Sequence, residues 1–334
     1  MYSRDKICLL QILSHSRPRF LAKIKKISIL SSLYQNSGKA CRLFMTLKIA
    51  HLGPTGTHTE AAALAYAQTE LAGRDICLQP YPSIAQTIAA VASGEVTLAI
   101  VPVENSIEGG VTMTADTIWQ IAAQLQIQQA IILPIHHALI SVATSLSEIA
   151  TVYSHPQALS QCQDWLQQHL PQAARIADSS TTAALTTLAA NPHTAAISSV
   201  RAAKLYELPV LVEPINDRPD NQTKFWAISL QPTVAGNCTS IAFSLRSNAP
   251  GGLMTALGFF ANRSLNLSRI ESRPSKRSLG DYLFFIDIET DVRNCPALKS
   301  ALADLDAYAE TVKNFGSYYT NTIINDLPDL PEAI

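Results

Sequence analysis

The stretch best suited to chemistry is a polar pentad, Asn-Gln-Thr-Lys-Phe, at residues 221–225. Turn-forming residues at 216–220 precede it, and an apolar, strand-like run at 225–230 follows. The pentad brings two amides, a hydroxyl and a cation to a junction between a loop and a strand, where binding residues often lie. The alternative is the start of a hairpin with a solvated face. The pentad therefore indicates a site only if other segments converge on it.

A hydroxyl-rich loop at 53–59, Gly-Pro-Thr-Gly-Thr-His-Thr, lies between an apolar strand at 48–52 and an alanine-rich helix. Such a loop presents backbone N–H groups and threonine hydroxyls to an anion at the helix N-terminus. It lacks the G-x-x-x-x-G-K pattern of a phosphate loop. Plain capping of the helix by Thr59 is the alternative. Because the loop is longer than a cap requires, we favour a role in ligand binding.

Three further polar segments follow expected strands. Glu104, Asn105 and Ser106 end one apolar strand, and ligands of α/β sheets bind at the carboxyl ends of strands. The segments at 154–158 and 178–184 each lead from a strand into a helix, the first with a proline at its first helical position. A solvated turn is the alternative for the first of these segments. Several helix N-termini at one cleft favour a small ligand with more than one negative charge.

Other kinds of site find little support in the sequence. His136 and His137 are adjacent in a long, strand-like segment at 129–142, where neighbouring side chains point to opposite faces. We expect them to be packed or surface histidines. The six cysteines form no C-x-x-C pair, which indicates reduced thiols rather than a zinc site. The chain also lacks a glycine-rich dinucleotide fingerprint and a convincing Ser-His-Asp spacing. We therefore expect neither a metal nor a cofactor.

Charge is distributed unevenly along the 334 residues. Residues 1–44 hold nine Lys or Arg and one acid, whereas the rest of the chain holds 16 basic and 25 acidic groups. An acidic body argues against nucleic acid as a partner, and no apolar run is long enough for a transmembrane helix. The basic leader is a poor signal peptide, and we expect it to be poorly ordered. We expect Met45 to be the natural start and the location to be cytoplasmic, with a plastid transit peptide as the alternative interpretation.

The alternation of strands and helices predicts an α/β fold of two lobes with a cleft between them, as in type II periplasmic solute-binding proteins. Residues 46–128 and 204–232 form lobe one, and residues 129–203 form lobe two, so the chain crosses at these boundaries. Residues 239–316 follow the order βαββαβ, which is a ferredoxin-like unit. Both a sensor module and a dimerisation unit are consistent with that order. Residues 317–334 form a C-terminal tail.

With these segments in order, the chain resembles bacterial prephenate dehydratases that carry a C-terminal regulatory ACT domain. The resemblance covers residues 46 to about 318 and makes residues 46–232 the dehydratase domain. The motifs that carry it are GPTGT at 53–57, VPVENS at 101–106, SHPQA at 154–158, SST at 179–181, NQTKF at 221–225, GGLM at 251–254 and IESRP at 270–274. Two positions depart from the family pattern, because Lys224 stands in place of arginine and Gly252 in place of alanine. Lysine keeps the charge but not the planar fork of arginine.

The resemblance implies conversion of prephenate to phenylpyruvate, carbon dioxide and water. It makes Thr223 the group beside the departing 4-hydroxyl and Phe225 the residue that packs the substrate ring. The implied substrate-binding residues are Thr55, Thr57, Asn105, Ser106, His155, Ser179, Thr181, Asn221, Gln222 and Lys224. The implied residues of an allosteric phenylalanine site are Gly251, Gly252, Leu253, Met254, Glu271, Ser272, Arg273 and Pro274. Glu104 is left out of these sets, because a second acid would repel a dianionic substrate.

Two alternatives stay open at this point. The first is arogenate dehydratase, the same chemistry on the aminated analogue, and the second is a non-catalytic amino-acid sensor or solute-binding protein. The implied partners are prephenate, L-phenylalanine as effector, and further copies of the chain in a homodimer or homotetramer, without nucleic acid or membrane. We also expect the two lobes to stay catalytic when the tail module is removed.

Overall fold

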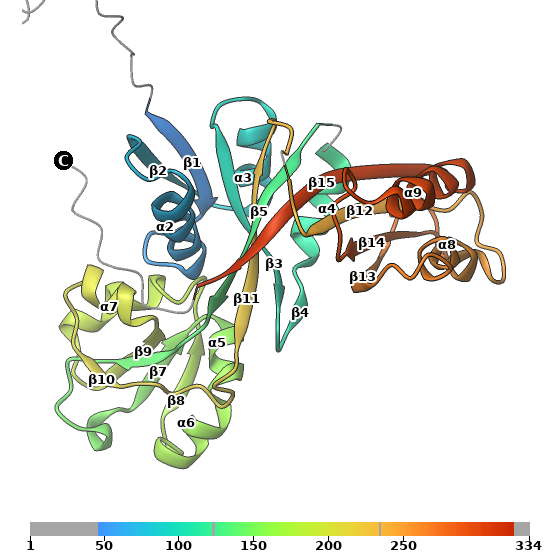
Figure 1. The fold of residues 1–334 in the computed structure, drawn as a ribbon. Coiled ribbons are helices and arrows are strands. Elements are labelled where there is room, and N and C mark those ends of the chain that lie inside the picture. The colour runs from blue at the N-terminus through green and yellow to red at the C-terminus, as the bar shows by residue number, and fades with distance from the viewer. Residues whose placement is uncertain (1–45, 122–123, 234, 324–334) are drawn as a thin grey trace, which may run out of the picture. The chain divides into compact units, whose positions relative to one another are not determined.

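The computed structural model describes residues 46–121, 124–233 and 235–323, which Figure 1 shows as a ribbon. The predicted leader, residues 1–44, lies outside these ranges, as do residues 324–334 of the predicted tail. Among the helices of the described ranges, none is long and apolar enough to cross a membrane.

Lobe one is a mixed sheet with helices α2 (His58–Glu70), α3 (Ile84–Ala92) and α4 (Thr112–Ile121) packed on it. In sheet order its strands are β2 (Ile76–Tyr81), β1 (Leu47–Leu52), β3 (Leu98–Asn105), β11 (Gln222–Ser229) and β5 (Gln126–Pro134). The short strand β4 (Gly109–Gly110) pairs with β3. Strand β1 is parallel to both of its neighbours, whereas β11 is antiparallel to β3 and β5.

Helix α2 begins two residues earlier than capping by Thr59 would place it. Its N-cap is Thr57, whose side-chain oxygen accepts a hydrogen bond from the Glu60 backbone N–H at 3.4 Å. The alternative interpretation, in which Thr59 caps this helix, is therefore wrong, and Thr59 is buried in its first turn. Helix α3 is capped by Ser83, whose hydroxyl accepts from the Gln86 N–H at 3.2 Å.

Lobe two is a second sheet of short strands. In sheet order they are β10 (Val210–Val212), β6 (Ala138–Ile140), β9 (Thr194–Ser198), β7 (Thr151–Ser154) and β8 (Ala174–Ala177). The helices are α5 (Pro156–Gln161), α6 (Gln163–His169) and α7 (Val200–Leu205), with 3₁₀ helices at Leu146–Glu148 and Ala183–Ala190. Pro156 stands at the predicted first helical position of α5. The helix expected after residues 178–184 is the second of the 3₁₀ helices.

The chain crosses between the lobes at other positions than predicted. The long apolar segment at 129–142 is broken at 135–137, so that β5 belongs to the first sheet and β6 to the second. On the return, β10 pairs with β6, which places it in lobe two. The second crossing therefore lies between β10 and β11. Apolar character alone does not show which sheet a strand joins, because that depends on its partner.

The tail module has the predicted βαββαβ order. Its elements are β12 (Cys238–Ser244), α8 (Gly252–Ala261), β13 (Leu267–Pro274), β14 (Tyr282–Ile288), α9 (Pro296–Tyr308) and β15 (Thr311–Thr322). The last strand is longer than the predicted end at 316. It pairs with β12 of its own module and then, at Tyr319–Thr322, in parallel with β5 of lobe one. One ten-stranded sheet therefore runs through lobe one and the tail module.

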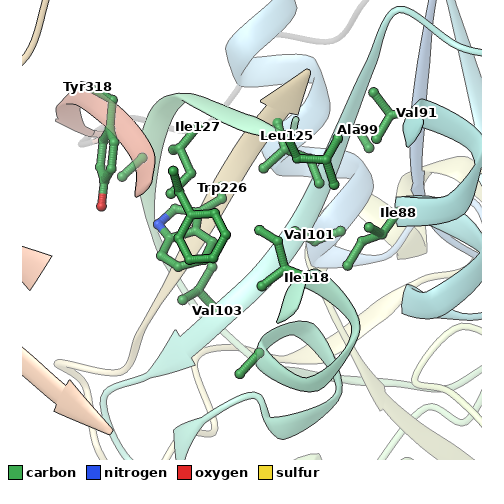
Figure 2. Close-up of a cluster of buried hydrophobic side chains, with 14 of the residues drawn as sticks. Ile88, Val91, Ala99, Val101, Val103, Ile118, Leu125, Ile127, Trp226 and Tyr318 are labelled. Atoms are coloured by element: carbon green, nitrogen blue, oxygen red, sulfur yellow. The ribbon is translucent and has the colours of Figure 1, made fainter. Parts of the chain in front are cut away.

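A shared hydrophobic core joins these two parts. Trp226 on β11 is 1% exposed and belongs to a cluster with Val101, Ile118 and Ile127 of lobe one, as Figure 2 shows. The same cluster contains several tail residues, Tyr318 among them. The other half of the tail module has a separate core between its sheet and helices α8 and α9. Removal of the tail would expose the shared core, so the prediction that the lobes act alone does not fit this packing.

Candidate active site

A cavity of about 850 Å³ lies at the carboxyl end of β1, among residues of both lobes. Lobe one contributes the loop after β1, the start of α2, the end of β3 and strand β11. Lobe two contributes the start of α5 and the loop after β8. Eight of the predicted site residues line it: Thr55, Thr57, Asn105, His155, Ser179, Thr181, Thr223 and Phe225. The segments that the sequence singled out therefore do converge.

The lining of the cavity is polar but uncharged. Among the described residues that line it, none is Lys, Arg, Asp or Glu. The polar groups are threonine and serine hydroxyls, the Tyr81 phenol, amides and the rings of His58, His137 and His155. Backbone N–H groups in the first turn of α2 add a positive potential. A carboxylate that enters would therefore be held by neutral donors, since protein N–H and O–H groups bind anions well away from bulk water.

Thr223 is oriented by Asn105. The Asn105 side-chain oxygen accepts hydrogen bonds from the backbone N–H groups of Ile107 and Glu108, both at 3.0 Å. Because backbone N–H groups can only donate, the Asn105 amide orientation is settled and its Nδ2 must be the donor. This Nδ2 donates to Thr223 Oγ1 at 2.9 Å. The Thr223 oxygen is therefore an acceptor in this bond, and its own O–H remains free to donate to a group in the cavity.

A second branch of the network leads from Asn105 into lobe two. Asn105 Nδ2 also donates to the side-chain oxygen of Asn221 at 2.8 Å, and Asn221 Nδ2 donates to Gln161 Oε1 at 2.9 Å. Gln161 Oε1 is in turn 3.0 Å from His137 Nε2. All four side chains are buried. Connected buried hydrogen bonds fix side chains in one arrangement, and here they extend from β3 to α5 across the two lobes.

Lys224 does not lie where the prediction placed it. Successive side chains of a strand point to opposite faces, so Lys224 lies opposite Thr223 and Phe225. Its Nζ donates to Asp287 on β14 of the tail module at 2.7 Å, and Asp287 is 1% exposed. The interpretation of Lys224 as a substrate ligand disagrees with this placement. Glu104, which sequence analysis left out of the site, also faces the tail module, with its carboxylate 3.7 Å from Arg269.

Three other predicted residues, Ser106, Asn221 and Gln222, lie outside the cavity lining. Ser106 and Gln222 bond to each other, because the Ser106 N–H donates to the Gln222 carbonyl and the Gln222 N–H donates to the Ser106 hydroxyl, both at 2.9 Å. Asn221 is completely buried within the network described above. These residues hold the ends of β3 and β11 together rather than line the cavity.

The loop after β1 is held by a charged pair that sequence analysis missed. Glu60 accepts from the Gly56 N–H at 2.7 Å and from Arg201 of α7 at 2.6 Å. Gly56 has φ +90°, and a Cβ added there would lie 3.1 Å from Thr182, so both conformation and space favour glycine. The pair fixes the loop while keeping its own charges outside the cavity lining. In the sequence, the spacing of four residues between Gly56 and Glu60 could have indicated the contact between them.

The two histidines of the segment 136–137 behave differently. His136 is exposed and His137 is buried, as expected for adjacent residues in an extended segment. His137 forms a T-shaped contact with His58, with ring centroids 5.8 Å apart. Burial lowers the pKa of His137 below its ordinary value and lowers the pKa of His58 to about 3, with His137 and Arg201 adding to the latter effect. Both rings are therefore neutral near pH 7.

Gln161, His58 and His137 line the cavity and were not predicted from the sequence as site residues. Gln161 stands four residues after Gln157, on the face of α5 that carries two cavity-lining residues, so helical spacing could have indicated it. Within the described residues, no group of three or more His, Cys, Asp or Glu could hold a metal ion. The described cysteines are free, with Cys162 and Cys238 buried.

The predicted phenylalanine motifs lie on α8 and β13 of the tail module. Gly251 has φ +78° at the start of α8, Leu253 packs against the core of the module, and Met254 is 76% exposed. On β13, Glu271 pairs with Arg269, and Arg273 pairs with Asp116 of lobe one at 3.2 Å. The carboxylate of Glu271 also lies beside Gly110 of β4. The side chains of this motif thus reach towards lobe one, and the phenylalanine site stays a prediction.

Comparison with known proteins gives one consistent result. Residues 49–233 match the family model described as prephenate dehydratase. The bifunctional chorismate mutase/prephenate dehydratase of Pseudomonas aeruginosa is 38% identical over 278 residues, which cover 81% of this chain and 73% of that protein. The prephenate dehydratase of Lactococcus lactis subsp. cremoris is 35% identical over 279 residues, which cover 81% of this chain and 97% of that protein.

A solved structure agrees with these relatives. The crystal structure of a prephenate dehydratase from Arthrobacter aurescens, in complex with L-phenylalanine, superposes with a TM-score of 0.74 at 36% identity. The match covers 82% of this chain and 90% of that one. With the family model matching more than half of the chain and the relatives covering more than two thirds of it, the chain belongs to the prephenate dehydratase family.

Proposed function

We propose that the cavity between the lobes is where this chain carries out the reaction of its family, the decarboxylating dehydration of prephenate to phenylpyruvate. The observation that carries the proposal is the bond from Asn105 Nδ2 to Thr223 Oγ1 at 2.9 Å. Because Asn105 makes the Thr223 oxygen an acceptor, the Thr223 O–H is available to the departing 4-hydroxyl of prephenate. Hydroxide is a poor leaving group, so a donor at this oxygen lowers the barrier.

The remaining roles follow from position. Phe225 is 1% exposed and lines the cavity, where it packs against the ring and keeps water away. The hydroxyls of Thr55 and Thr181, with the N–H groups at the start of α2, hold the two carboxylates. The Thr57 hydroxyl donates to the Leu52 carbonyl at 3.1 Å and the Ser179 hydroxyl to Asp178 at 3.2 Å, so these two shape the lining. As the ring carboxylate departs as carbon dioxide, its electron pair enters the ring and the C4–O bond breaks. Aromatisation drives both steps.

Phenylpyruvate release tests the proposal directly. We expect the purified chain to form phenylpyruvate from prephenate and to turn over arogenate at most slowly. The two substrates differ in one group, a keto oxygen that accepts hydrogen bonds and an ammonium that donates them. The described lining offers a dicarboxylate many donors and offers an ammonium no carboxylate. A higher kcat/KM for arogenate would reassign the substrate, and no product from either would refute the catalytic role.

We also propose that residues 239–322 are an ACT domain that binds L-phenylalanine and reports it to the cavity. The relative from Arthrobacter aurescens was solved with L-phenylalanine, and the tail module has the βαββαβ order. Its strand β13 lies at the edge of the sheet and exposes Ile270, so a second copy could pair beside it in a homodimer or homotetramer. Inhibition requires that phenylalanine bind the less active arrangement more tightly.

Titration calorimetry with L-phenylalanine on the intact protein tests this second proposal. We expect binding that weakens when prephenate is present, because coupling between two sites is reciprocal and amounts to about 1–3 kcal/mol. Met254→Asp at the exposed predicted site should abolish the heat of binding, whereas Lys299→Asn on the exposed side of α9 should keep it. No heat with the wild type, or unchanged binding with Met254→Asp, would contradict the assignment.

A further inference from the structure

Two buried ring nitrogens at the cavity have no hydrogen-bond partner: Nε2 of His58 and Nδ1 of His137. Burying a polar atom without a partner costs free energy, so such atoms in a substrate cavity need an explanation. The two rings are in edge-to-face contact, with their centroids 5.8 Å apart. The proposed roles of Thr223 and Phe225 use neither of them.

The hydrogen-bond network determines the tautomer of His137. Two backbone N–H groups make Asn105 Oδ1 an acceptor, so Asn105 Nδ2 donates to Asn221 Oδ1, and Asn221 Nδ2 donates to Gln161 Oε1. His137 Nε2 lies 3.0 Å from that same oxygen, which can only accept. His137 Nε2 must therefore carry the hydrogen. In the neutral ring, the unpartnered Nδ1 then holds a lone pair and is a base.

The surroundings keep this base unprotonated while the cavity is empty. Burial lowers the pKa of His137, and the neighbouring His136 adds to the effect. His58 faces it from α2 and is neutral for the same reason. The nearby charges are engaged elsewhere, since Arg201 pairs with Glu60 and Asp217 accepts from the N–H groups of Asp164 and Trp165 at the start of α6. Within the described lining, no carboxylate favours a protonated ring.

A dianionic substrate reverses this balance. Two carboxylates within the cavity favour the charged form of a nearby imidazole. The Gln161 bond serves the imidazolium as well as the neutral ring, because Nε2 carries a hydrogen in both. Protonation at Nδ1 therefore needs no rearrangement of the network. The reaction also needs this proton, since the dianion prephenate yields the monoanion phenylpyruvate, carbon dioxide and water.

We propose that His137 takes up a proton at Nδ1 when the dianionic substrate binds and delivers it to the departing 4-oxygen that Thr223 holds. This inference rests on the proposed function. The C4–O bond breaks with its electron pair going to oxygen, the Nδ1 proton joins that oxygen, and water leaves. The bond from the ring to the carboxylate breaks at the same time, and its pair completes the aromatic ring. His137 returns to the neutral form and takes its next proton from solvent.

The test compares pH profiles of kcat for the wild type, His137→Gln and His136→Gln. Glutamine at 137 keeps an N–H for Gln161 but has no titratable nitrogen, and His136 is its exposed neighbour. We expect the wild type and His136→Gln to lose kcat at alkaline pH, where the bound form of His137 deprotonates. His137→Gln should lower kcat by about 10²-fold, the lower end of general-acid contributions, and its remaining rate should be independent of pH.

The pH profiles can contradict the proposed role of His137 in three ways. A pH-independent kcat of the wild type would overturn the inference without any variant, and so would wild-type kcat or a retained alkaline limb in His137→Gln. If melting shows that His137→Gln does not fold, His137→Asn carries the same comparison. If the wild type forms no phenylpyruvate at all, the proposed function fails rather than the role of His137.

Discussion

The two faces of strand β11 differ sharply in their chemistry. Thr223 and Phe225 face the substrate cavity, whose described lining holds no charged side chain. Lys224 and Trp226 face the tail module, where Lys224 bonds to Asp287 at 2.7 Å and the Arg269 guanidinium lies 5.7 Å from the centre of the Trp226 ring. The face that must bind an anion is neutral, and the face that binds only protein is charged.

The reason for the difference is the cost of burying charge. A buried charge needs a partner, and the protein supplies one on the tail side, where Asp287 accepts from Lys224 and from the Ser240 hydroxyl at 2.5 Å. In the cavity, the proposed partner is the substrate. The lining groups are hydroxyls and N–H donors, and an unpaired neutral group costs less free energy to bury than an unpaired charge. One residue along the strand therefore separates the proposed catalytic residue Thr223 from Lys224, which contacts the tail.

The charged face continues along the junction between lobe one and the tail module. Asp116 of α4 lies 3.2 Å from Arg273 and 2.6 Å from Lys276, and Glu104 of β3 lies 3.7 Å from Arg269. With the β5–β15 pairing, these contacts tie the tail to the strands that carry Asn105 and Thr223. Residues of β13 and β14 therefore contact β3 and β11 directly.

The largest effect is expected from the cavity face. Thr223→Ala should lower kcat by about 10²-fold or more, because it removes the hydroxyl beside the departing oxygen. Substrate binding, measured by calorimetry, should survive, and Thr223→Ser should keep part of the rate because it retains the hydroxyl. Lost binding with unchanged turnover of bound substrate would show that Thr223 is a binding residue only.

The tail face should respond in stability rather than in catalysis. Lys224→Met leaves the buried Asp287 carboxylate short of a partner and should lower the free energy of unfolding by about 3 kcal/mol, with kcat within a few-fold of the wild type. Denaturant unfolding of Lys224→Met, Asp287→Asn and the double variant measures the coupling, which we expect at about 1 kcal/mol or more. Strictly additive effects, or a loss of kcat like that of Thr223→Ala, would break the distinction between the two faces.

A smaller effect is expected from pH at the junction. Burial opposes ionisation of Asp116, but the bonds from Lys276 and Arg273 outweigh it and lower its pKa. A carboxyl whose pKa is lowered by folding adds stability above its unfolded value of about 3.9, and this stability is lost as pH falls through the folded pKa. The difference in unfolding free energy between the wild type and Asp116→Asn should therefore shrink in acid. A constant difference would mean that the ion pairs contribute nothing.

Lys224→Arg should have the smallest effect. Arginine keeps the charge and can bond the Asp287 carboxylate with two N–H groups, so kcat and KM should stay within a few-fold. The thermal midpoint should stay the same or rise slightly. A large increase in KM would return residue 224 to the substrate, where sequence analysis first placed it.

The sequence by itself determined the features that depend on neighbours along the chain. The proline at the start of α5 and the βαββαβ order of the tail both follow from local conformational preferences. The opposite environments of His136 and His137 follow from the alternation of an extended segment. The motifs that contain Thr55, Asn105 and Thr223 also marked the cavity, because polar residues at strand ends are informative without a partner.

Only the tertiary structure decided which partner each face meets. The alternation of β11 places Lys224 opposite Thr223, but it takes the pairing of β15 with β5 to bring Asp287 to that lysine. The tautomer of His137 depends on Asn105, Asn221 and Gln161, which come from three separate segments and are joined by bonds spanning up to 116 residues. Such contacts are set by sheet register and by the packing of lobes, and no local preference specifies them.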